Sequence, residues 1–94
     1  MKARVAEAVT KFTDIPNVGP RVAGDFVLLG IKTPQGLKGK DAFTLYTKLS
    51  KLTGVRQDPC VLDVFLAVTD FMNGAPARPW WFYTPERKKQ FPKL

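Results

Sequence analysis

The chain has 94 residues and a net charge of +7, with 45% hydrophobic and 24% charged residues. This length excludes a second independent core, and the composition excludes wholesale disorder. The single cysteine excludes an internal disulfide, and the absence of histidine removes the commonest metal ligand and the commonest general base. Because no apolar leader and no membrane-length apolar run occurs, we expect a cytoplasmic protein without a membrane partner.

The positive charge is distributed unevenly along the chain. Residues 1–40 carry a net charge of +4, residues 41–75 carry −1, and residues 76–94 carry +4. A basic excess at both ends is typical of a protein that binds a polyanion. A basic surface that only keeps a small protein in solution is the competing interpretation, and charge alone does not separate the two.

Apolar spacing in the first half of the chain predicts two helices. A helix over residues 3–12 is expected from residues that recur at helical intervals: Val5, Ala8, Val9 and Phe12. A second helix is expected over residues 21–29, with Gly30 as its terminating residue. Thr33 followed by Pro34 predicts the N-cap of a short helical turn.

Two longer helices are predicted in the second half. Asp41 is a suitable N-cap for a helix that ends at Gly54, and Asp58 caps a last helix that runs to about Asn73. This last helix is apolar on more than one face, so we expect it at the centre of the core or covered by the tail. Since no segment alternates apolar and polar residues, the prediction is an all-α, compact bundle of about five helices.

Between the first two predicted helices lies a turn rich in Pro, Asn and Gly, residues 16–22. With Pro20 at the first helical position, backbone amides point outward at the positive end of the helix dipole, which suits a phosphate. The predicted contact residues for nucleic acid are Asn17, Val18, Gly19, Arg21, Val22 and, for its charge, Lys11. The alternative is a turn that only orients two helices or that binds another protein.

The order of helix, turn and helix is repeated. A second, longer turn over residues 52–59 joins the last two predicted helices, but it lacks a glycine after its valine. If the repeat is real, two helix-hairpin-helix units pack about a pseudo-two-fold axis, in a SAM-domain-like arrangement. Only the first unit would then keep a phosphate-binding turn.

The carboxyl-terminal segment, residues 76–94, differs from the preceding domain, residues 1–75, and is called the tail. It combines aromatic and basic side chains, which can stack on exposed bases and contact phosphates in single strands: Arg78, Trp80, Trp81, Arg87, Lys88 and Lys89. We favour the alternative in which Trp80 and Trp81 fold back onto the last helix, with the chain beyond Pro85 mobile.

No catalytic, metal-binding or cofactor-binding constellation is evident. Asp41 and Asp58 are explained as helix caps, and Asp70 is expected to be solvated on a helix face. Cys60 lies at the start of a helix, where the dipole favours a thiolate, but nearby carboxylates and the lack of a second cysteine favour a buried structural role. We therefore expect neither an enzyme nor a small-molecule substrate.

Four groups of residues resemble the small bacterial helix-hairpin-helix family of pathogenicity-locus or mitomycin-resistance proteins. They are residues 16–23, 29–31, 45–46 and 58–65, and the similar region runs from about Phe12 to Phe82, where residues 79–81 resemble the aromatic ending of the family. The wider superfamily implies sequence-nonspecific DNA binding through hairpin amides, sometimes with a monovalent cation on hairpin carbonyls. The superfamily usually has glycine where this chain has Asn17, which makes close approach of a phosphate backbone less favourable.

The sequence thus predicts a non-catalytic module that binds DNA weakly and nonspecifically through residues 16–22. A protein-protein interaction adaptor with the same fold is the alternative, and a thiol-dependent stress protein that uses Cys60 is a weaker one. No cofactor is expected for any of the three.

Overall fold

The computed structural model describes residues 2–94, and all regular structure in this range is helical. The α-helices are α1 (Pro20–Leu28), α2 (Ala42–Thr53), α3 (Pro59–Met72) and α4 (Thr84–Gln90). Four short 3-10 helices accompany them: η1 (Ala6–Ala8), η2 (Phe12–Asp14), η3 (Pro34–Leu37) and η4 (Trp80–Phe82). The all-α class is confirmed, whereas the described residues form four α-helices rather than about five.

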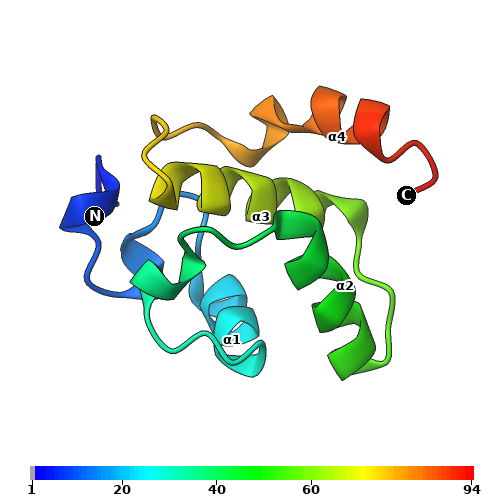
Figure 1. Ribbon diagram of the computed structural model, residues 1–94, viewed down its shortest axis with the longest axis horizontal. Coiled ribbons are helices and arrows are strands. Elements are labelled where there is room, and N and C mark those ends of the chain that lie inside the picture. Colours follow the sequence, from blue (N-terminus) through cyan, green and yellow to red (C-terminus); the bar gives the residue numbers. More distant parts are fainter. Residues whose placement is uncertain (1) are drawn as a thin grey trace.

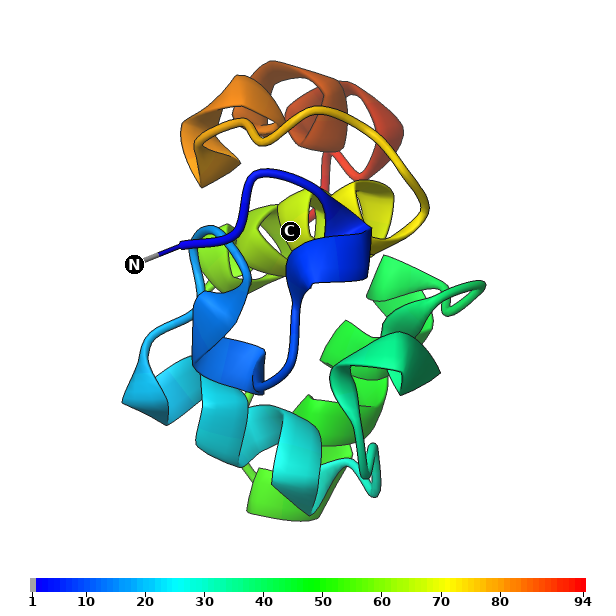
Figure 2. The same ribbon diagram turned by 90° about the vertical axis from the view of Figure 1, so that its left-hand side faces the viewer.

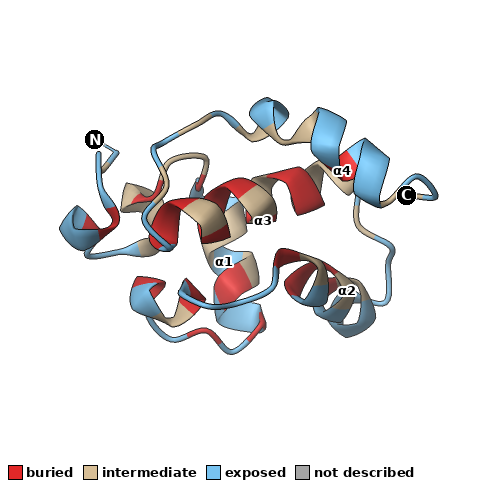
Figure 3. Cartoon of the chain, turned by 45° about the horizontal axis from the view of Figure 1, so that its top comes forward, coloured by how far each residue is buried: buried red, intermediate tan, exposed pale blue. Residues whose placement is uncertain are grey.

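Helix α3 is the centre of the structure. It lies between α1 and α2 on one side and the tail on the other (Figures 1 and 2). Phe65 contacts the ring of Phe26 from α1, with 5.3 Å between the ring centroids, and burial is concentrated along α3 (Figure 3). Helix α3 is apolar on more than one face because both of its sides are covered in the fold, and the tail packs the partly buried Phe91 and Leu94 against the core.

Most of the predicted helix ends are confirmed. The Asp41 carboxylate accepts a hydrogen bond from the amide of Thr44 at 2.9 Å, and the Asp58 carboxylate accepts one from the amide of Cys60 at 2.9 Å. Gly54 follows α2 with a φ of 71°, a left-handed conformation that favours glycine. Thr33 precedes η3 as expected, but its side chain makes no capping hydrogen bond.

The single helix predicted over residues 3–12 is wrong. The structure has η1 and η2 there, separated by extended backbone at Val9 and Lys11. The Asp14 carboxylate accepts hydrogen bonds from the amides of Thr10 and Lys11 at 3.0 and 3.1 Å, and from the Thr10 hydroxyl. These bonds lower the pKa of Asp14 to about 2. A side chain that binds nearby amides in a turn competes with a continuous helix, which explains the break.

The end of the tail, which we expected to be mobile, forms α4. Arg87 of α4 and Asp63 of α3 are both buried, and they form a bidentate ion pair, with Nε to Oδ1 at 2.8 Å and Nη2 to Oδ2 at 3.2 Å. The Thr84 hydroxyl donates to the same carboxylate at 2.8 Å. Because Asp63 would be an uncompensated buried charge without Arg87, this pair holds α4 against α3.

A second polar contact joins the tail to α3. The Tyr83 hydroxyl donates to the Asp70 carboxylate at 2.6 Å, and the Arg78 guanidinium lies 3.7 Å from the same carboxylate. Asp70, which we expected to be solvated without a partner, therefore has two partners in the tail, and its side chain is 46% exposed. Partial burial and the bond to Asp70 raise the pKa of Tyr83, which keeps its hydroxyl a proton donor at neutral pH.

We predict that Arg87→Met lowers the free energy of unfolding by about 3–5 kcal/mol, because it leaves the Asp63 carboxylate buried and unpaired. Urea denaturation followed by circular dichroism measures this change. Lys88→Met is the matched control on the exposed face of α4 and should change stability by less than about 0.5 kcal/mol. The double variant Asp63→Leu with Arg87→Met should recover most of the loss. Equal stabilities of Arg87→Met and Lys88→Met would contradict the assignment.

Candidate nucleic-acid interface

The predicted phosphate-binding turn joins η2 to α1. Ile15 and Val18 are completely buried and fix the turn to the core. Gly19 precedes α1 in an extended conformation with a φ of −98°, and Pro20 is at the start of the helix. Gly19, Pro20 and Arg21 are exposed, so the apolar side of the turn packs inward and its polar side faces solvent.

Three backbone amides of the turn remain available to a ligand. Within residues 2–94, no hydrogen bond is donated by the amides of Gly19, Arg21 or Val22. They lie at the N-terminal end of a nine-residue helix. Unpaired amides at the positive end of a helix dipole attract an anion, and the exposed Arg21 side chain adds a cation beside them.

Lys2 contacts this turn, although it was not among the contact residues predicted from the sequence. Its ammonium donates to the Thr13 carbonyl at 2.7 Å and to the carbonyl of Val18. These two carbonyls are thus bound by a side-chain cation. A metal ion would have to displace the Lys2 ammonium to bind them. No local pattern indicates this contact, because it joins residues that are eleven and sixteen positions apart.

Asn17 connects the turn to the tail. It adopts a φ of 73°, in the left-handed region that the superfamily glycine would occupy easily. Its side-chain nitrogen donates to the Arg78 carbonyl at 2.8 Å, and its side-chain oxygen accepts from the Trp80 amide at 3.2 Å. An asparagine side chain is needed for both bonds, which gives a physical reason for asparagine at this position.

The other predicted contact residues of the turn fall into two groups. Val18 is excluded as a contact, because its side chain is buried and its amide donates to the Ile15 carbonyl at 3.1 Å. The side chains of Lys11 and Arg21 are exposed. Asp25 lies one helical turn after Arg21, and partial burial raises the pKa of its carboxyl group, an effect that Arg21 opposes.

The tail residues also divide by exposure. Trp81 is 63% exposed, Lys88 and Lys89 are exposed, and Trp80 is half-buried. The Arg78 guanidinium lies 4.6 Å from the centroid of the Phe82 ring. Arg87 must be removed from the predicted set of contacts, because it is buried in the ion pair with Asp63. We favoured a prediction in which both tryptophans pack on the core, and this prediction fits the half-buried Trp80 better than the exposed Trp81.

Cys60 is half-buried at the start of α3. Burial raises the pKa of its thiol, and the carboxylates of Asp58 and Asp63 raise it further. These effects oppose the helix dipole, so the thiol stays protonated at neutral pH.

We predict that iodoacetamide alkylates Cys60 more slowly at pH 8 than it alkylates a model thiol, with the rise in rate shifted to higher pH. Asp58→Asn keeps an N-cap residue but removes one carboxylate, so it should move this rise toward lower pH. Mass spectrometry of timed samples gives both rates. A wild-type rate equal to or above that of the model thiol would restore the reactive interpretation.

We predict that Asn17→Ala and Asn17→Gly both accelerate hydrogen exchange at the Trp80 amide, because each removes the side-chain oxygen that accepts from it. Asn17→Ala should also be less stable than Asn17→Gly by about 1 kcal/mol, since alanine tolerates the left-handed conformation poorly. Amide exchange by NMR and urea denaturation measure the two effects. Unchanged exchange at Trp80 would show that Asn17 does not hold the tail.

No helix within residues 2–94 combines the length and apolar character required to cross a membrane. The same residues contain no group of three or more acidic or cysteine side chains placed to hold a metal ion.

Comparison with known proteins gives the family. The model of the Cdd1 pathogenicity locus family matches residues 5–89. The mitomycin resistance protein McrB of Streptomyces lavendulae is 46% identical over 77 residues, which cover 82% of this chain and 73% of that protein. No solved structure matches the chain. The family match and the identity to McrB together show that this chain belongs to the pathogenicity locus family.

Proposed function

We propose that the chain is a non-catalytic helix-hairpin-helix module that binds DNA nonspecifically in the cytoplasm. In this proposal η2, the 16–22 turn and α1 form the first unit, and α2 and α3 form the second. The observation that carries the proposal is the set of unpaired amides at Gly19, Arg21 and Val22 beside the Arg21 side chain. Such donors contact phosphates without reading bases, so the binding would be nonspecific.

The connection through Asn17 supports a larger contact surface. Because Asn17 holds the tail backbone at Arg78 and Trp80, the tail segment that carries the exposed Trp81 lies beside the turn. A phosphate on the turn amides would then have an aromatic ring and the basic side chains of the tail within reach of the same strand. Aromatic stacking of this kind favours unpaired bases over a continuous duplex.

The non-catalytic part of the proposal is supported by the roles of the acidic residues. Asp14, Asp41 and Asp58 accept hydrogen bonds from backbone amides. Asp63 and Asp70 are held by Arg87 and Tyr83. With these carboxylates committed to the fold and no histidine in the sequence, the chain has few groups that could serve as general acids or bases.

A protein-interaction adaptor is the second candidate, and exposed apolar side chains favour it. Val27 on α1 is 65% exposed, and Trp81 and Phe82 on the tail are 63% and 55% exposed. Apolar side chains at these positions are typical of protein contacts when they form one patch. A DNA-binding module would use Trp81 but has no need of Val27.

We predict that Gly19→Glu weakens binding to a random duplex at least tenfold, because it adds a carboxylate beside the amides that would contact the phosphate. Gly19→Ala is the matched control, since a Cβ atom at this position meets open space. Fluorescence anisotropy at increasing salt should give micromolar binding by the wild type with a shallow salt dependence, since few phosphates are contacted.

Two outcomes would contradict the DNA proposal. If Gly19→Glu binds as tightly as Gly19→Ala at low salt, the turn is not the contact site. If the wild type binds neither duplex nor single-stranded DNA at the lowest salt, the adaptor becomes the better candidate. Circular dichroism of both variants establishes that the helices are intact.

A further inference from the structure

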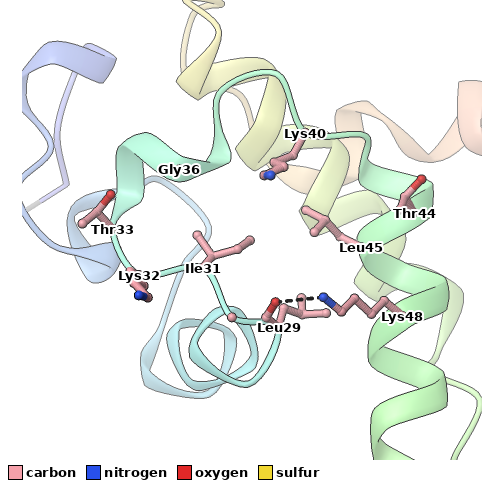
Figure 4. A pocket seen from close by; sticks show the side chains of 10 residues that line it. Leu29, Ile31, Lys32, Thr33, Gly36, Lys40, Thr44, Leu45 and Lys48 are labelled. Atoms are coloured by element: carbon pink, nitrogen blue, oxygen red, sulfur yellow. Dashed lines mark hydrogen bonds between the residues drawn. The ribbon is translucent and has the colours of Figure 1, made fainter.

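A pocket of about 440 Å³ lies between the loop that follows α1 and the first half of α2 (Figure 4). Its position is at the C-terminal end of α1, whereas the 16–22 turn is at the N-terminal end. Helix α1 has nine residues, which corresponds to a length of about 13 Å. A ligand in this pocket is therefore separate from a phosphate on the turn amides. The volume is in the range of small-molecule sites.

The charged residues of the pocket are all positive. Lys32, Lys40 and Lys48 line it, and none of its described lining residues is acidic. Figure 4 shows Lys40 and Lys48 reaching in from the side of α2, with Lys32 on the opposite rim. Three lysines around one cavity repel one another, so an anion bound among them would be stabilised by all three.

The lysine side chains are not committed to acidic partners. The Lys48 ammonium donates to the Leu29 carbonyl at 3.3 Å, which holds it at the pocket and leaves its other protons available. The ammonium groups of Lys32 and Lys40 make no hydrogen bond or ion pair within the part of the chain that the structure covers. Thr33 lies at the rim as a further polar residue, whereas the Thr44 hydroxyl donates to the Asp41 carboxylate at 2.9 Å and points away from the pocket.

The floor of the pocket is apolar. Ile31 and Leu45 face each other across it, and both are buried in the core (Figure 4). Gly36 lies close behind, where a Cβ atom would approach the Ile31 side chain to 3.2 Å, so the glycine leaves room for Ile31 at the floor. Ile31 and Leu45 keep 7% and 6% of their surface exposed, and an inorganic ion would leave this small apolar area uncovered. A planar or hydrocarbon body would bury it.

We propose that this pocket binds a phosphomonoester with a planar body whose faces are apolar, of which a mononucleotide is a simple example. The phosphate carries up to two negative charges and matches the cluster of Lys32, Lys40 and Lys48 better than a single carboxylate does. The body lies on Ile31 and Leu45. A phosphomonoester joined to a nucleoside occurs both in a free mononucleotide and at the 5′-phosphorylated end of a nucleic-acid strand. The site does not depend on DNA binding at the turn.

The test is a titration of the isotopically labelled full chain, followed by amide NMR shifts, with thymidine 5′-monophosphate, thymidine and inorganic phosphate. Thymidine 5′-monophosphate should shift the amides of residues 31–33 and 44–48 in a saturable way, at least tenfold more tightly than either fragment. A 5′-phosphorylated trinucleotide is the second probe. Tighter binding of the mononucleotide identifies a free ligand, and tighter binding of the trinucleotide identifies a strand end; each result supports the site.

Matched variants assign the effect to the pocket. Lys40→Glu should weaken binding of thymidine 5′-monophosphate at least tenfold, whereas Lys38→Glu should change it less than twofold, because Lys38 is an exposed lysine outside the pocket. Equal effects of the two variants would overturn the proposal. So would thymidine 5′-monophosphate binding no more tightly than inorganic phosphate or thymidine. Gly19→Glu should leave this binding unchanged, which separates the pocket from the proposed DNA contact.

Discussion

The buried ion pair between Asp63 and Arg87 is the constraint on which the arrangement of this structure depends. A carboxylate in the middle of an apolar helix is costly to bury alone, so the conformation that supplies Arg87 is strongly preferred. Pairing fixes α4 on α3, and α3 thereby becomes a central helix with neighbours on both sides. The tail packs Phe91 and Leu94 against the core, which adds apolar contacts to a small domain.

The same constraint reaches the 16–22 turn through Asn17. Once α4 and η4 lie on α3, the backbone at Arg78 and Trp80 is placed beside the turn, and the Asn17 side chain binds it. Lys2 binds the Val18 carbonyl of the turn and the Thr13 carbonyl of the preceding η2. The turn is therefore held by both ends of the chain, and its amides face solvent without needing to rearrange. A rigid arrangement of this kind lowers the entropic cost of binding a phosphate.

Four of the seven basic residues in the first forty positions lie at two separate places. Arg21 and Lys2 lie at the turn, and Lys32 and Lys40 lie at the pocket beyond the other end of α1. In the sequence these two groups of basic residues cannot be told apart, because both lie within the segment 1–40 that has a net charge of +4. In our proposals the turn and the pocket are two anion sites with different ligands, a nucleic-acid backbone at the turn and a compact phosphomonoester at the pocket.

The sequence by itself determined the elements with local signals. Capping by Asp41 and Asp58 and termination at Gly30 and Gly54 act within a few residues, so α1, α2 and α3 were predicted close to their observed bounds. Only the tertiary structure decided the rest. From the sequence, Arg87 was expected to be an exposed basic side chain, Asp70 a solvated carboxylate and Asn17 a less favourable substitute for glycine. Each of them has a partner between 8 and 63 positions away, and no local pattern in the sequence reveals such a partner.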